Sequence, residues 1–110
     1  PTSFSIEKQL TSTPQNIVDI SSGGTQSVVT SLSFFNTSAT EYTRVTVYRI
    51  PSGGTAGTTN IISQNIVGPG KSLINIEVLG EVFSNGMFCQ AQVSAGTAVN
   101  VNCSGDIFSS

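Results

Sequence analysis

The chain of 110 residues contains no histidine and no tryptophan, and charged side chains make up only 9% of it. Without histidine, imidazole general-base catalysis and histidine metal sites are excluded. Ordinary soluble domains carry about 25% charged residues. Four basic side chains cannot neutralise many phosphates, so a nucleic-acid binder is not expected. Apolar runs reach no more than three residues, which excludes a transmembrane helix.

Neutral polar side chains take the place of the missing charges. The chain has 17 Ser, 13 Thr, 8 Asn and 6 Gln, and its net charge is −2. Apolar residues still make up 37% of the chain, and many of them are β-branched. Disordered segments instead combine few such residues with a high net charge. We therefore expect a folded chain whose length fits one domain over residues 1–110.

Short segments in which apolar and polar residues alternate recur along the chain, separated by turns rich in Gly, Pro and Ser. No window of ten residues shows a 3.6-residue period, so no substantial helix is expected. Seven or eight strands at this spacing predict an all-β fold, an antiparallel β-sandwich or jelly roll. The predicted strands cover 3–11, 16–20, 26–35, 42–50, 60–67, 71–79, 87–93 and 98–103, and residues 107–108 add a last pairing.

Within three of these strands the alternation also predicts which side chains face the core. The inward sets are Phe4, Ile6 and Leu10; Val28, Leu32 and Phe34; and Ile74, Ile76 and Val78.

The two cysteines lie in neighbouring alternating segments joined by the turn 94–97. A hairpin centred on Gly96 would place Cys89 opposite Cys103 on one face. Directly opposed Cβ atoms lie about 4.5–5.5 Å apart, whereas a disulfide prefers about 3.8 Å. Free core thiols are therefore favoured over a disulfide, and two cysteines form no structural zinc site.

No pattern in the sequence indicates catalysis or a cofactor. The glycines of 53–57 lead into a strand and lack the Gly-Lys-Ser/Thr ending of a phosphate-binding loop. No spacing pairs the carboxylates, and no Asp-x-Asp pattern supports a calcium site. We expect no enzyme, no catalytic or metal-ligating residues and no cofactor. The carboxylates are Glu7, Asp19, Glu41, Glu77, Glu81 and Asp106.

The segment 82–105 contains no charged residue. Exposed edge strands usually carry charges that prevent pairing with other chains, and a low net charge promotes association. Two interpretations are open: a buried central hairpin, or an edge or face that another subunit covers.

The stretch 34–54 combines an apolar pair, Asn-Thr-Ser, a Thr/Val-rich strand and a Pro-Ser-Gly-Gly loop, and 68–73 adds Gly-Pro-Gly-Lys-Ser-Leu. Over residues 26–103 this pattern resembles small all-β virion structural proteins of tailed bacteriophages. The resemblance implies a capsid decoration (cement) protein that stabilises capsomer contacts, or a head-fibre, tail or tail-fibre module. It brings no catalytic residues.

A virion protein assembled in the host cytoplasm would bind the major capsid protein or other virion proteins, and decoration proteins often form homotrimers. The start of the chain resembles no signal peptide, which fits cytoplasmic folding. Predicted contact regions are 51–60, 80–86 and 1–13, the last as an N-terminal strand or arm that adds to a partner's sheet. The alternatives are a carbohydrate-recognition or fibre-tip module and, third, a small enzyme. The predicted interface residues are Phe35, Tyr48, Pro51, Gly53, Gly54, Val82, Phe83 and Asn85.

Overall fold

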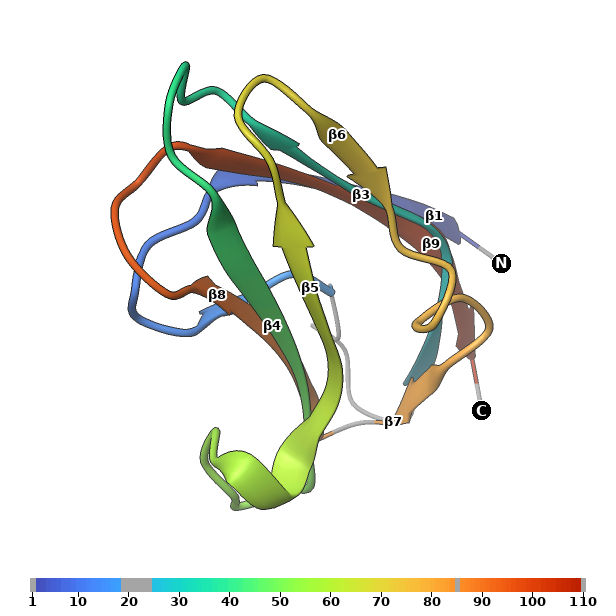
Figure 1. Cartoon of the computed structure of the whole chain (residues 1–110). Coiled ribbons are helices and arrows are strands. Elements are labelled where there is room, and N and C mark those ends of the chain that lie inside the picture. The colour runs from blue at the N-terminus through green and yellow to red at the C-terminus, as the bar shows by residue number, and fades with distance from the viewer. Residues whose placement is uncertain (1, 19–24, 85, 110) are drawn as a thin grey trace.

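Two antiparallel β-sheets pack face to face in the computed structural model, which describes residues 2–18, 25–84 and 86–109 (Figure 1). The all-β sandwich predicted from the alternation is therefore confirmed. In the described part of the chain, the only helix is a single 3₁₀ turn, Thr58–Asn60. No helix there is long and apolar enough to cross a membrane.

The first sheet has the strand order β1-β9-β3-β6, and β7 also pairs with β3. The second sheet has the order β2-β8-β4-β5. The strands of the first sheet are β1 (Thr2–Gln9), β3 (Thr25–Asn36), β6 (Ser72–Ile74), β7 (Val82–Ser84) and β9 (Val99–Ser109). Those of the second sheet are β2 (Gln15–Asn16), β4 (Thr43–Ile50), β5 (Ile61–Val67) and β8 (Phe88–Val93).

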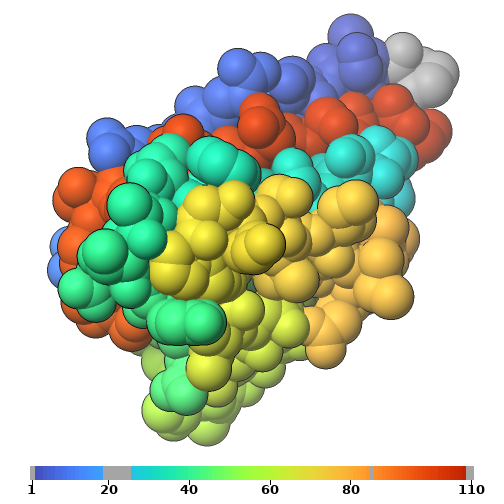
Figure 2. All heavy atoms as spheres, turned by 45° about the horizontal axis from the view of Figure 1, so that its top comes forward, coloured from blue at the N-terminus to red at the C-terminus, as the bar shows by residue number. Residues whose placement is uncertain are grey.

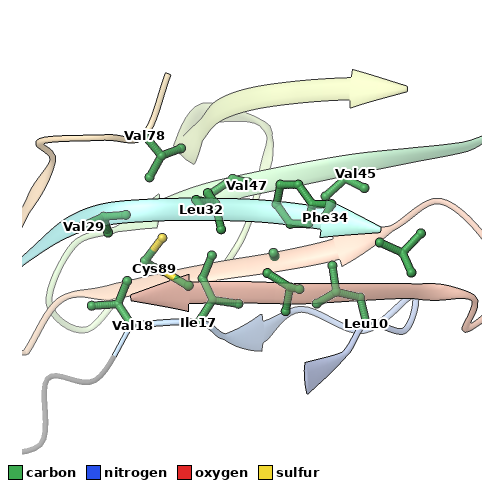
Figure 3. Packing of buried hydrophobic residues seen from close by; sticks show 14 of the residues in the cluster. Leu10, Ile17, Val18, Val29, Leu32, Phe34, Val45, Val47, Val78 and Cys89 are labelled. Atoms are coloured by element: carbon green, nitrogen blue, oxygen red, sulfur yellow. The ribbon is translucent and has the colours of Figure 1, made fainter. Parts of the chain in front are cut away.

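The core fills the space between the sheets with side chains from alternate positions of both (Figure 3). Phe4 and Leu10 lie in it as predicted, and Ile6 packs against it half-buried. The most buried large side chains are Phe34, Phe83, Leu10, Ile17, Leu32 and Ile50. Alternation gives each strand one apolar face, and burying both apolar faces against each other is what stabilises a sandwich.

The predicted cysteine hairpin is wrong. β8 pairs with β4 and β2 in the second sheet, whereas β9 pairs with β1 and β3 in the first. The segment between them crosses from one sheet to the other. The predicted inward face is nevertheless correct, because Cys89 and Cys103 are both buried, free thiols. Each faces the core from its own sheet, and alternation alone cannot distinguish this arrangement from a hairpin.

The inward face of β3 differs from the prediction at one residue. Leu32 and Phe34 point into the core, but Val28 faces outward and Val29 takes the inward position. The pairing with β9 shifts between Val29 and Ser31, where Thr30 is an extra residue. Such a β-bulge reverses the alternation, so each side chain before it changes face.

The predicted strand over 71–79 is shorter than expected. β6 ends at Ile74, and Ile74 and Ile76 are 73% and 72% exposed, which corrects their assignment to the core. Val78 is buried as predicted. The strand ends because the side-chain oxygen of Asn75 accepts hydrogen bonds from the backbone N–H groups of residues 77 and 78, an Asx turn that competes with strand pairing.

The predicted strand 16–20 is likewise reduced. β2 contains only Gln15 and Asn16, and the next two residues, Ile17 and Val18, are buried. The remainder of that prediction, residues 19–20, lies outside the described residues.

Candidate interaction surfaces

The described part of the chain shows no cluster of side chains that could bind a metal or act together in catalysis. No group of three or more Cys, Asp or Glu there could hold a metal ion. Burial raises the pKa of the Cys103 thiol to about 12, and burial together with Cys103 raises that of Cys89 still further. Neither thiol is therefore a nucleophile at neutral pH. The candidate functional features are instead surfaces and strand edges.

The outer face of the first sheet is divided into two parts. On β1 and β9 it presents small neutral polar side chains, such as Ser5, Asn100 and Asn102, with the carboxylates of Glu7 and Asp106. Figure 2 shows β1, β9, β3 and β6 side by side across the molecule in this order. β1 therefore forms one border of the sheet, and β6 with β7 forms the other.

Exposed apolar side chains follow the border formed by β6 and β7. Phe35 lies diagonally across from Ile74, because Ser33 is the direct partner of Ile74. Further along β3, Val28 pairs with Val82. We call the exposed set on this side the apolar border; it consists of Phe35, Ile74, Ile76, Leu79 and Val82, with exposed fractions from 37% to 73%.

The outer face of the second sheet is more polar and partly covered. The Tyr48 ring is 9% exposed, and its hydroxyl donates a hydrogen bond to Oε1 of Gln92 on β8 (2.6 Å). On β5, which pairs with β4, Gln64 and Ile66 are exposed, the latter at 59%. Arg44 is exposed on β4. Apart from Ile66 and Phe88, this face gives a partner mostly amide and hydroxyl groups.

Each sheet has one long edge strand and one short edge. β1 contains eight residues and pairs with β9, whereas β5 contains seven residues and pairs with β4. No other strand of the described chain pairs with either. The opposite edges are formed by β2, with two residues, and by β6 and β7, with three each. Short edges limit pairing with other chains, but β1 and β5 lack that protection.

A polar network connects β5 to the segment between β6 and β7. The Ser63 hydroxyl donates to a carboxylate oxygen of Glu77 (2.8 Å) and accepts from the side-chain amide of the buried Asn75 (2.8 Å). Asn65 donates to the same hydroxyl and the same carboxylate. The hydrogen bonds from Asn65 and Ser63 lower the pKa of Glu77. The network fixes the position of β5 relative to the first sheet.

Arg49 closes the opposite end of the sandwich. Its guanidinium carbon lies 4.9 Å from the centre of the Phe83 ring, and Nη1 lies 3.7 Å from a carboxylate oxygen of Glu81. Because Phe83 is fully buried, the cation covers a core residue on β7 and joins the two sheets.

The predicted interface residues fall into three groups. Phe35 and Val82 are exposed and belong to the apolar border, and Pro51, Gly53 and Gly54 are exposed in the loop after β4. By contrast, Tyr48 and Phe83 are buried within the chain, because large β-sheet aromatics pack under neighbouring segments. Asn85 lies outside the described residues. Partner contact at the exposed positions stays a prediction.

The predicted contact region 1–13 is placed over most of its described residues. Residues 2–9 pair with β9 and so are part of the chain's own sheet, and binding of a partner along their open edge stays a prediction. Sequence reasoning missed Ile74 and Ile76 as surface residues. The signal that could have indicated their exposure is Asn75 between them, since Asn favours turns.

Comparison with known proteins gives a fold and no family. No family model matches the chain, and no curated protein matches it. A solved structure of a Bacillus endospore appendage, described as belonging to a novel family of disulfide-linked pili, shares 17% sequence identity. The alignment has a TM-score of 0.51 and covers 97% of this chain and 84% of that one. At this identity the likeness shows a shared β-sandwich fold.

Proposed function

We propose that this chain is a structural subunit that assembles into a larger protein array, and that it is not an enzyme. The observation that carries the proposal is the apolar border, in which Ile74 and Ile76 are both more than 70% exposed. Contiguous exposed apolar side chains mark interaction sites in proteins. The carboxylates beside them are engaged within the chain, Glu77 by Ser63 and Asn65 and Glu81 by Arg49, so exposure of this border favours association.

The chemistry of the described residues supports the same proposal. Ser, Asn and Gln make up most of the remainder of the first sheet's outer face, beside Glu7, Asp106 and Phe108. Burying such neutral polar side chains against a neighbour that completes their hydrogen bonds costs less than burying charges. The solved appendage structure is a pilus protein, which gives one example of this fold in a polymer. The resemblance of residues 34–54 to phage virion proteins gives a second class of assembly.

The two classes of assembly differ in the oligomer that they would form. A decoration protein would form a closed oligomer, a homotrimer, that binds the major capsid protein. An appendage or fibre subunit would form an open chain of copies. The recognition-module alternative needs two exposed aromatic rings close together on one face. Phe35 and Phe108 lie at opposite ends of the first sheet, and Tyr42 and Phe88 lie at opposite ends of β4, before its first residue and across from its last. The assembling subunit is therefore the function that we propose.

Native mass measured by light scattering across a concentration series, with negative-stain electron microscopy, tests the proposal. We expect particles larger than one chain. A variant carrying Ile74→Thr and Ile76→Thr should raise the dissociation constant of these particles at least tenfold. Phe108→Thr is the matched control, because it removes an exposed apolar side chain from the same sheet outside the apolar border. A stable mass of three chains would favour the decoration protein, and an open series of masses would favour a filament.

A wild-type protein that stays monomeric at the highest concentration would overturn self-assembly. A monomer that bound no isolated phage capsid either would overturn the structural-subunit proposal as a whole.

A further inference from the structure

We infer that the open edge of β1 in one copy pairs with the open edge of β5 in the next copy, so that the subunits join head to tail. This inference rests on the proposed function and names the joint that would build the assembly. The occupant of each edge is a second copy of this chain.

The first argument is the length of the two edges. β1 presents eight residues and β5 presents seven, while the short edges offer two or three. An antiparallel or parallel ladder is as long as its shorter strand. Pairing between long edges, of β1 with β5 or of two like edges, therefore makes more backbone hydrogen bonds than any pairing with a short edge, and the unlike pair is the one that can repeat from copy to copy.

The second argument is the lack of protection on these edges. Residues 61–67 include no charge and no proline, and residues 2–6 include none either. Monomeric sheet proteins place Lys and other charged residues, or Pro, on such strands to prevent edge-to-edge pairing. On β1 the charges are confined to Glu7 and Lys8 at its end, and Lys8 donates a hydrogen bond to the backbone oxygen of Asn16 within the same chain.

The third argument is that the two edges lie on opposite sides of the sandwich. A tight turn at residues 68–71 connects β5 to β6, so β5 lies on the β6 side of the molecule. Leu10 and Thr11 bond to Val99 and Val93, so the short link from β1 places β2 on the β1 side. An interface between two different surfaces on opposite sides repeats from copy to copy, and it produces an open filament, or a ring where the rotation between copies closes.

The fourth argument is the stiffness of the β5 edge. Ser63 and Asn65, which alternate along β5, are held through Glu77 and Asn75 to the segment that follows β6. An edge fixed in its extended form loses little conformational entropy when it pairs, and this raises affinity. The network thus holds β5 in the extended conformation that pairing with a second strand requires.

Complementation between two edge variants tests this joint without knowledge of its register. Ser5 and Gln64 are exposed near the middle of β1 and β5, and a lysine at either position should block its own edge. We expect Ser5→Lys and Gln64→Lys each to be monomeric, with mass falling at least threefold from that of the wild type. Mixed together, they should form dimers and nothing larger, because one free β1 edge meets one free β5 edge.

Asn102→Lys is the matched control, since Asn102 is exposed on β9, an interior strand of the same sheet, and pairs with Glu7 and Ser33, outside the apolar border. It should assemble like the wild type. Circular dichroism and a cooperative thermal transition verify folding, and Ser5→Glu or Gln64→Glu replaces any lysine variant that fails this check.

The outcomes separate this inference from the proposed function. A monomeric wild type contradicts this inference and self-assembly, and a monomer that also binds no capsid contradicts the structural-subunit proposal as well. If the wild type assembles and either edge variant still elongates, or if Gln64→Lys dimerises alone through two β1 edges, the β1–β5 joint is wrong and the structural-subunit proposal stands.

Discussion

The ring of Phe4 packs over Gly105, the residue directly opposite it in the ladder between β1 and β9. A Cβ built on Gly105 would lie 2.8 Å from Cε2 of Phe4 and would overlap the carbonyl oxygen of Val28. The missing side chain thus creates the space that the ring fills. It also lets β9 approach β3 beside the bulge at Thr30, where the register shifts. Glycine next to a bulge, covered by an aromatic ring, is a known device for curving a sheet.

Replacing Gly105 should therefore destabilise the fold. Because backbone would have to move away from the new Cβ, we expect Gly105→Ala to lower the free energy of unfolding by about 2–4 kcal/mol, measured by urea denaturation. Gly57→Ala is the control: Gly57 has an extended backbone with φ of −166°, and an added Cβ meets nothing within 4 Å. Equal stability of the two variants would contradict the packing described for Phe4.

The buried thiols should make the protein less stable in alkaline solution. Both thiols have a folded-state pKa raised above the value of about 8.5 for a free cysteine, Cys103 to about 12. The stabilisation is complete below pH 8.5 and is lost as the pH rises toward the folded-state value. The expected slope is about 1.4 kcal/mol per pH unit for each thiol, measured from urea denaturation between pH 8 and 11.

The double variant Cys89→Ala and Cys103→Ala serves as the control, because every other ionisable group is retained. Its stability should depend less steeply on pH than that of the wild type, whatever the cost of the smaller side chains. Parallel curves for the two proteins would show that the thiols are already ionised or accessible in the folded state.

Thiol accessibility gives an independent prediction about assembly. Cys89 and Cys103 are 0% and 1% exposed and are the only cysteines of the chain. A thiol reagent should therefore label two thiols in urea and fewer than one tenth of them in the folded protein within the same time. We also expect no disulfide-linked multimers on a non-reducing gel of folded protein. Labelling at equal rates in both states would contradict the buried placement.

Arg49 should stabilise the fold more through its contact with the Phe83 ring than through its ion pair with Glu81. The two side chains of the ion pair are 33% and 40% exposed, so solvent screens it, whereas the ring contact covers a fully buried residue. We expect Arg49→Met to cost about 1 kcal/mol and Glu81→Gln less than about 0.5 kcal/mol in thermal denaturation. Equal losses, both removed by high salt, would assign the stabilisation to the ion pair instead.

Asn75 should be the critical member of the polar network. Its side chain accepts hydrogen bonds from two backbone N–H groups and donates to Ser63, and it is 2% exposed. Asn75→Ala would leave buried groups without partners, so we expect a loss of about 2–3 kcal/mol by urea denaturation. Asn65→Ala, at a half-buried position of the same network, should cost less than half as much. The reverse order would contradict the role assigned to Asn75.

The sequence by itself determined the class of fold and much of the core. It predicted seven or eight strands, whereas the described residues form nine, because β7 lies where only a turn was expected. Alternation with a period of two gives each strand an apolar face, and that local pattern requires two layers to bury it. It correctly predicted Leu32, Phe34 and both cysteines as inward residues. It also indicated a surface poor in charge, which depends on composition alone.

Only the tertiary structure decided which strands pair. The pattern around Gly96 fits a hairpin and a crossing between sheets equally well, because both arrangements turn the same side chains inward. Thr30 reversed the alternation before it, and Asn75 ended β6 and left Ile74 and Ile76 exposed. A bulge and a turn each depend on one residue and on the strand packed beside it. The open edges of β1 and β5, on which the proposed assembly depends, follow from strand order, and strand order is set by contacts between residues far apart in the chain.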